Sequence, residues 1–256
     1  MAIKHNSELQ TGPEGCNISQ KELIKHFSSS ECYDNIFSPK ELEELTEYMF
    51  NNTNDYHLGN TAGLLQLLGN FDQLFEMLKE RLRPYVDVDI ATAIQGNFFH
   101  TSQQYGIHTD TPERGAWEKE NIPYKSVIIP LYLLPDTSKC GIVFYDQRIA
   151  DVGVTLDKGV QTISHYDSID DYSTIENAYT GNGKKVIIGD EMFPQSLMDE
   201  YGLKNKNRHR GLTVEHHFNW VPGSLMVFDT AQVHESTPGN FITKGGLRLS
   251  LFRSSK

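Results

Sequence analysis

The pattern of apolar and polar positions divides the chain into a helical first third and a strand-rich remainder. Before residue 86, apolar side chains recur every three or four positions, which is the spacing of one face of a helix. Ser38–Glu41 is a capping box with proline at the first helical position, so a helix is predicted to begin there. A second helix is predicted from Asn60 to Arg83, ended by Pro84. Its apolar stripe predicts that it packs against a sheet.

From Val86 onward, short apolar or alternating runs are typical of strands. Pro130 lies inside one of these runs, which favours an edge strand or a bulge at that position. Pro222 and Gly223 together predict a turn between two runs. The predicted strands are Val86–Ile90, Ser126–Leu134, Gly141–Tyr145, Lys185–Ile188, Leu212–Phe218, Ser224–Phe228 and Leu247–Phe252.

Many short strands behind a helical segment predict a mainly β fold with some α structure. We expect a double-stranded β-helix, a jelly-roll and cupin relative, with the N-terminal helices packed on one sheet. The stretch 146–211 is polar and long for a connection inside a compact barrel, which is typical of a lid or an ordered insertion. We therefore expect one domain over residues 1–256. It should comprise a helical N-terminal region over 1–85, a β core over 86–145 and 212–256, and the insertion or lid over 146–211.

Composition narrows the setting and the partners. The net charge of −11 disfavours nucleic acid and anionic membranes as partners, because polyanions are repelled. Three widely spaced cysteines, Cys16, Cys32 and Cys140, form neither a disulfide framework nor a cysteine-type zinc site. The first residues lack the apolar core of a signal peptide, and no apolar stretch approaches the ~20 residues that span a bilayer. We expect a soluble protein in the reducing cytoplasm.

Four residues in three separated motifs carry the candidate chemistry. His108 and Asp110 stand in the segment Tyr105–Asp110, His234 follows 126 residues after His108, and Arg248 follows 14 residues later. Side chains two apart on an extended strand point to the same face, so His108 and Asp110 can reach one metal. Two imidazoles and one carboxylate on one face of a metal leave three adjacent positions open, as non-haem Fe(II) oxygenases require.

A His-x-Asp triplet alone is a weak signal, and a second one occurs at His165 and Asp167. That second triplet lies in a polar stretch typical of a loop. His108 instead follows Gly106 and precedes a predicted strand, so the first triplet is the stronger candidate.

The complete pattern of His-x-Asp, a long gap, His and then Arg resembles that of the Fe(II)- and 2-oxoglutarate-dependent dioxygenases. The resemblance covers roughly Phe98–Phe252, through motifs rather than continuous similarity. It implies Fe(II) held by His108, Asp110 and His234, with 2-oxoglutarate and O2 as cosubstrates and release of succinate and CO2. Related halogenases carry alanine or glycine where this chain has Asp110, so hydroxylation or another oxidative outcome is expected.

The resemblance also suggests residues for the cosubstrate. Arg248 and Ser250 resemble the Arg-x-Ser pattern that holds the distal carboxylate of 2-oxoglutarate in some members of the family, and a guanidinium is a planar fork for a carboxylate. The alternative is a structural salt bridge between Arg248 and an Asp or Glu. Tyr105 and Asn97 are further candidates, because polar residues near the first motif often help to hold the cosubstrate in the family.

Two pairs of residues and one single residue have further interpretations. Arg208 and Arg210 form a basic cluster in an acidic chain and either receive an anionic group of the substrate or are a solvated charge run. One of the two neighbouring histidines, 216 and 217, faces the site or is a packing residue. Asp229 is interpreted as a turn residue rather than a ligand.

The functional classes also remain open at this stage. The leading hypothesis is an oxygenase that hydroxylates a small-molecule or amino-acid-like substrate, with a peptide substrate as a variant. The second is a cupin-like metal-binding or isomerase protein that does not use 2-oxoglutarate. The third is a non-catalytic binding domain.

Overall fold

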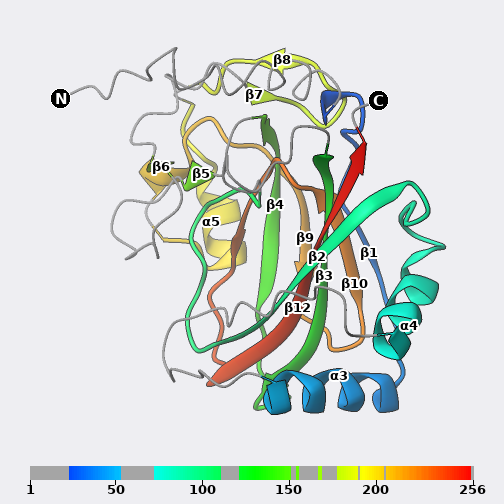
Figure 1. Ribbon diagram of the computed structural model, residues 1–256. Helices are drawn as coiled ribbons and strands as arrows, with labels where there is room; N and C mark the ends of the chain where they lie inside the picture. Colours follow the sequence, from blue (N-terminus) through cyan, green and yellow to red (C-terminus); the bar gives the residue numbers. More distant parts are fainter. Residues whose placement is uncertain are drawn as a thin grey trace.

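The computed structural model describes residues 23–52, 72–110, 121–150, 154–155, 167–168, 178–189, 191–204 and 206–254. Within these ranges the protein is mainly β, with three α-helices and two facing antiparallel sheets, consistent with a jelly-roll fold (Figure 1). None of the described helices is long and apolar enough to cross a membrane.

Five antiparallel strands form the larger sheet, in the order β1-β10-β3-β12-β2. The smaller sheet has the order β11-β4-β7-β8, and β9 also pairs with β4. A separate parallel pair joins β5 and β6. The bounds are β1 Glu31–Tyr33, β2 Ala91–Thr101, β3 Asn121–Leu134, β4 Gly141–Ile149, β5 Val154–Thr155, β6 Asp167–Ser168, β7 Ala178–Tyr179, β8 Lys185–Val186, β9 Val214–Asn219, β10 Leu225–Asp229, β11 Gln232–Ser236 and β12 Thr243–Ser254.

Two helices cover the outer face of the larger sheet: α3 (Pro39–Asn52) and α4 (Asp72–Leu82). Their buried side chains share one hydrophobic core with alternate residues of β12, namely Leu45, Met49, Leu78 and Leu82 with Leu247, Leu249 and Leu251. The predicted capping box is confirmed at α3, because the backbone N–H of Ser38 donates to Glu41 Oε2 at 2.8 Å and that of Glu41 donates to Ser38 Oγ at 3.3 Å. Of the helix predicted over 60–83, α4 confirms the second half, and residues 60–71 lie outside the described ranges.

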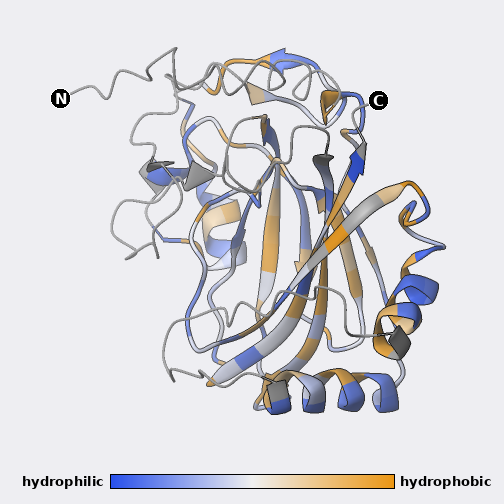
Figure 2. Ribbon diagram, viewed as in Figure 1, coloured by the Kyte–Doolittle hydropathy of each residue, from blue (hydrophilic) through white to orange (hydrophobic). Residues whose placement is uncertain are grey.

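A second core fills the space between the two sheets. Met226 and Phe228 of the larger sheet meet Ile142 and Phe144 of the smaller one, and Trp220 closes the same cluster. Apolar stretches follow the central strands of both sheets (Figure 2). The inward faces of β11 and β12 border this core, and they carry the candidate residues His234 and Arg248.

The strand predicted over Val86–Ile90 is wrong, and the prediction for Pro130 is partly wrong. The run Val86–Ile90 forms turns, because its backbone hydrogen bonds are local, as in Val86 N–H to Leu82 O at 3.0 Å and Ala91 N–H to Val88 O at 3.2 Å. Its alternation has another cause, since Val86 and Val88 are buried against the helices. The strand begins only at Ala91. Pro130 lies not at an edge but in central β3, where the register with β12 shifts, so the bulge prediction holds and the edge prediction does not.

Two of the regions predicted within the chain differ in detail from the structure. The N-terminal region is not purely helical, because Glu31–Tyr33 add an edge strand to β10. The range 146–211 begins inside the core, because residues up to Ile149 complete β4 and pair with β7 and β11. Later in that range lie α5 (Gln195–Tyr201) and the 3-10 helix η3 (Lys206–His209). A covering role for the range stays a prediction.

Candidate metal centre

The two histidines of the predicted site stand directly opposite each other. The backbone N–H of each donates to the carbonyl of the other at 2.9 Å, which makes His108 and His234 a hydrogen-bonded antiparallel pair. Further along, the backbone N–H of Asp110 donates to Thr230 O at 2.9 Å. Main-chain hydrogen bonds therefore align the first motif with β11 and the residues just before it.

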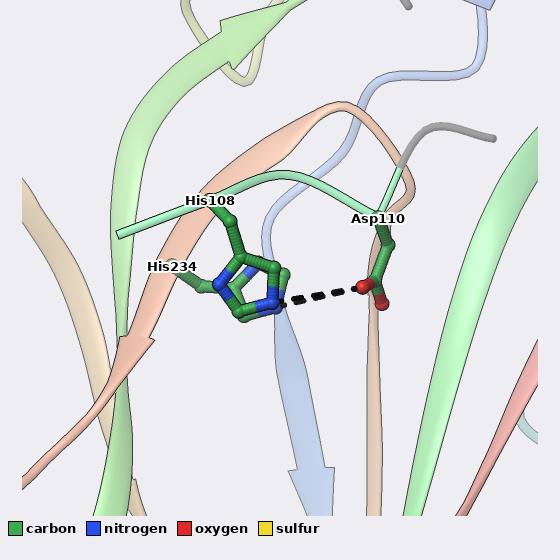
Figure 3. A group of neighbouring side chains, drawn as sticks. All are labelled: His108, Asp110 and His234. Atoms are coloured by element: carbon green, nitrogen blue, oxygen red, sulfur yellow. Dashed lines mark ion pairs between the residues drawn. The ribbon is translucent and has the colours of Figure 1, made fainter. Parts of the chain in front are cut away.

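This alignment brings three side chains together, as the sequence predicts. The ligand atoms of His108, Asp110 and His234 all lie within 4.8 Å of one another. Nε2 of each histidine is 3.9 Å from Asp110 Oδ1, and both imidazoles face the carboxylate (Figure 3). Contacts of 3.9 Å are too long for hydrogen bonds. The spacing instead resembles that of three donors arranged around an ion.

Both imidazoles are held with the same nitrogen toward Asp110. Nδ1 of His108 lies 2.6 Å from Gly106 O, and Nδ1 of His234 lies 2.9 Å from Gln232 O. A carbonyl oxygen only accepts, so Nδ1 carries a hydrogen, and in the neutral ring the lone pair is then on Nε2. A hydrogen bond of this kind fixes the tautomer and ring orientation of metal-binding histidines. The two Nε2 atoms are therefore preset as metal donors.

The carboxylate of Asp110 is almost fully buried and is kept ionised by its neighbours. Burial alone would raise its pKa, but the positive charge of Arg248 and its hydrogen bond to the carboxylate oppose burial, and the pKa is held below its usual range. Oδ1 accepts a hydrogen bond from Arg248 at 2.7 Å. Oδ2 is buried and has no hydrogen-bond partner among the described residues. A buried charged oxygen without a partner is costly, and a cation placed beside the two Nε2 atoms would satisfy it.

His234 is suited to bind a metal without competition from a proton. Burial lowers its pKa to about 4, and the neighbouring His108 adds to this effect. The rings of Phe144 and Phe228 pack against the imidazole, with centroids 5.6 and 4.9 Å away. The neutral form, which is the ligand form, is therefore present at physiological pH.

Arg248 contacts the carboxylate of the site itself. Its Nη1 donates to Asp110, and with the Asn97 amide oxygen turned toward the guanidinium, Nη2 donates to that oxygen at 3.1 Å. Asn97 is the direct β2 partner of Arg248. This ion pair with Asp110 agrees with the alternative interpretation, in which Arg248 forms a structural salt bridge. A role of Arg248 in holding 2-oxoglutarate stays a prediction.

Tyr105 and Ser250 lie beside the site at different depths. Tyr105 is 36% exposed, with its ring centroid 6.2 Å from that of His108. Burial raises its pKa, and the charge of Arg248 opposes this. Ser250 is buried two residues beyond Arg248 on β12, opposite Ser126 of β3. Their predicted roles are not tested by these positions.

Sequence reasoning missed Lys244, which is 1% exposed. It shares a face of β12 with Arg248, four residues away, because β12 pairs with β2 without a register shift between them. Its Nζ lies 3.4 Å from Ser236 Oγ and over the rings of Trp220 (4.5 Å) and Phe241 (5.3 Å). No carboxylate pairs with it among the described residues, and burial lowers its pKa to about 8. The signal was available: the alternation that turns Arg248 inward also turns Lys244 inward.

Other residues singled out in the sequence lie away from the three ligands. Asp229 is not a turn residue but ends β10, fully buried, where it accepts a hydrogen bond from Arg148 Nε at 2.9 Å and pairs with Lys125. Buried carboxylates require such partners. His216 contacts Ser29 Oγ at 3.2 Å, and the roles predicted for Arg208 and Arg210 stay predictions.

No model of a known protein family matches the chain, and no curated protein matches it in sequence. Solved structures do resemble it. A viral collagen prolyl hydroxylase from Paramecium Bursaria Chlorella virus-1, solved as a 2OG complex, has a TM-score of 0.47 and 9% identity, covering 88% of this chain and 97% of that one. EvdO2 from Micromonospora carbonacea var. aurantiaca has a TM-score of 0.45 and 12% identity, covering 92% and 90%. SnoN, a non-heme alpha ketoglutarate dependent epimerase, has a TM-score of 0.42 and 9% identity, covering 93% of this chain and 84% of that one.

The viral prolyl hydroxylase and EvdO2 were solved as complexes with 2-oxoglutarate, and SnoN is named as alpha ketoglutarate dependent. Their identities to this chain are 9–12% and their TM-scores are below 0.5. We therefore base the function on the geometry of the site.

Proposed function

We propose that this protein is a non-haem Fe(II)- and 2-oxoglutarate-dependent oxygenase. The observation that carries this proposal is the meeting of His108, Asp110 and His234, whose ligand atoms all lie within 4.8 Å of one another, while Oδ2 of Asp110 has no hydrogen-bond partner among the described residues. Two nitrogens and one carboxylate oxygen on one side of an ion form the donor set that Fe(II) oxygenases use.

We also propose that the fold is a double-stranded β-helix and that the chain forms one oxygenase domain. In support, the core strands alternate between the sheets: β2 and β3 lie in the larger one, β4 and β9 in the smaller, and then β10, β11 and β12 alternate. The segment around His108 joins the smaller sheet through its bridge to β11. This pairing places the two histidines opposite each other on neighbouring chain segments.

The distal carboxylate of 2-oxoglutarate has two candidate cations, Arg248 and Lys244. Arg248 already pairs with Asp110 and Asn97, and a protonated Lys244 pairs with no anion among the described residues. Ser236, beside Lys244, is two residues after His234 on the same face of β11, which is about 7 Å along a strand. We therefore propose that Lys244 and Ser236 hold the distal carboxylate and that Arg248 mainly orients Asp110.

When bound, iron and 2-oxoglutarate would allow O2, the oxidant, to insert one oxygen atom into a C–H bond of the substrate, while the other atom would enter succinate as 2-oxoglutarate loses CO2. The protein's own contribution is to turn Nε2 of each histidine toward Asp110, to keep Asp110 ionised and to surround the site with apolar rings. Because Asp110 occupies a ligand position, we propose hydroxylation of a small-molecule or amino-acid-like substrate.

The test is to add Fe(II) and 2-oxoglutarate to the metal-free protein without oxygen and to record the visible spectrum. Chelation of iron by 2-oxoglutarate gives a metal-to-ligand charge-transfer band, whereas a cupin-like metal protein would bind iron without it. His234→Ala should abolish the band. A wild-type protein that binds iron but never shows the band would refute the proposal.

The same titration separates the two cations. Lys244→Ala should raise the 2-oxoglutarate concentration at half-saturation by at least about tenfold, because one charge-assisted bond is worth ~1.5 kcal/mol or more. Arg248→Ala should change the affinity for iron more than that for 2-oxoglutarate. If Arg248→Ala weakened 2-oxoglutarate binding and Lys244→Ala did not, Arg248 would be the residue that holds the cosubstrate, as the sequence analysis suggests.

A further inference from the structure

The reverse face of the strands that carry the histidines is also fully packed. Neighbouring side chains on a strand point to opposite faces, so Val233 and Glu235 face away from the site that His234 enters. Ile107 has the same relation to His108. Ile107 and Val233 are buried in one hydrophobic cluster on this outer face of the smaller sheet.

A compact loop covers this face; its described residues are 189, 191–204 and 206–211, and it is called the 189–211 loop. Its ends meet, because the backbone N–H of Gly211 donates to Glu191 O at 2.8 Å and a Cβ on Gly211 would lie 2.1 Å from Gly189 O. Gly211 also has φ +69°, a conformation that favours glycine. The loop contains α5, whose Met198 shares the cluster with Val143 and Tyr145 of β4. Its buried side chains in the shared cluster are Phe193, Met198 and Leu203.

One buried polar contact joins the loop to β11. Nε2 of His209, which is 1% exposed, lies 2.6 Å from Glu235 Oε1. The Tyr145 hydroxyl donates to the same oxygen, and the His209 ring packs on that of Phe193 with centroids 5.2 Å apart. A buried carboxylate requires such donors, because losing one leaves a desolvated charge underpaired. Contacts on the outer face of the smaller sheet therefore hold Glu235 in place, and Glu235 is the residue that follows His234 in the chain.

We propose that the 189–211 loop is a positioning element of the metal centre and that His209 is the positioning residue through which it acts. This rests on the proposed metal-binding role of His108, Asp110 and His234. His209 touches none of these side chains. By fixing Glu235 it fixes the backbone of β11, and through the reciprocal N–H···O bonds it fixes His108 as well. Metal sites tolerate only about 0.5 Å of ligand displacement, and loss of outer partners typically costs about 10–100-fold in metal affinity.

The first arm of the test needs no metal. Amide hydrogen exchange of the peptides that contain His108 and His234 is measured in the metal-free wild type and in His209→Ala. We expect exchange of these two bridged amides to become about tenfold faster in the variant. His209→Gln, which keeps a donor for Glu235, should restore most of the protection and serves if the alanine variant does not fold.

The matched control is His217→Ala. The His217 ring packs on Tyr201 of the same loop at 4.8 Å, but its β9 backbone pairs with β4, not with β11. It should leave the two amides protected. Equal exchange in the wild type and His209→Ala, or equal acceleration in both alanine variants, would overturn the role of His209.

The second arm measures Co(II) affinity and the visible spectrum of the cobalt protein. We expect His209→Ala to bind Co(II) about tenfold more weakly with a changed spectrum, and His209→Gln and His217→Ala to resemble the wild type. Unchanged affinity and spectrum in His209→Ala would overturn the proposal. A wild type that binds no cobalt, with the exchange result as expected, would instead remove the proposed metal function and with it the positioning role.

Discussion

Replacement of Lys244 by methionine is expected to stabilise the metal-free protein and to weaken cosubstrate binding. Burial lowers the lysine pKa from 10.5 to about 8. At about 1.4 kcal/mol per pKa unit, this corresponds to about 3 kcal/mol of destabilisation at neutral pH. Methionine fills a similar space without a charge but loses the cation–π contacts with Trp220 and Phe241, worth about 1–2 kcal/mol. The net gain should be about 1–2 kcal/mol.

The pH dependence follows from the direction of this pKa change. Below about pH 8 the folded and unfolded chains both carry the proton on Lys244, so the cost of the buried charge is constant. Between about pH 8 and the ordinary pKa of 10.5, the unfolded chain binds more protons than the folded one, so stability rises with pH. The advantage of Lys244→Met over the wild type should therefore shrink across this window.

Urea denaturation of the metal-free proteins at pH 7 and pH 9.5 measures both effects. Adding Fe(II) and 2-oxoglutarate without oxygen should stabilise the wild type by about 2.7 kcal/mol when 2-oxoglutarate is at 100 times its Kd, and the variant by much less. Lys125→Met is the contrasting control, because Lys125 pairs with the buried Asp229 and its loss should destabilise. A Lys244→Met protein that is less stable than the wild type and still gains full stabilisation from 2-oxoglutarate would refute the reasoning.

Three further results are expected. His108→Ala and His234→Ala should each abolish iron binding measured by equilibrium dialysis while the chain stays folded by circular dichroism, and retained binding in either would move the ligand elsewhere. Arg248→Ala should raise the pKa of Asp110, because it removes the largest charge that opposes burial, so a titration of iron affinity against pH should lose affinity at a higher pH than the wild type. Ser38→Ala should cost about 1 kcal/mol in urea denaturation by removing the cap of α3, and a change below about 0.3 kcal/mol would contradict the capping role.

Much of the site follows from local periodicity. Same-face spacing on extended chain predicts that His108 and Asp110 share a metal, and that Arg248 and the alternate leucines of β12 face opposite sides. These expectations need only the alternation of strand side chains. The approach of His234 to His108 could not be derived from spacing. It came from the resemblance, and the structure shows the backbone bridge that produces it.

Other features depend on tertiary contacts that periodicity does not encode. Val86 and Val88 alternate like a strand, yet they pack under the helices from turns, because their backbone groups bond locally. Asp229 looks like a turn residue by composition, but Arg148 and Lys125 neutralise it inside the fold. Neither partner can be identified from sequence without knowing the order of the strands.

The bridge between the two histidines also has a kinetic consequence. Its partners are 126 residues apart, so the backbone bonds that align the ligands close one of the long loops of the fold. Contacts of such high sequence separation form slowly, because loop closure costs entropy before the contact compensates for it. A metal ion therefore meets a pocket that exists only after both sheets have assembled, unlike the ion of a zinc finger, which drives folding. Chelators should accordingly empty this site reversibly, leaving a folded chain that accepts a metal again without refolding.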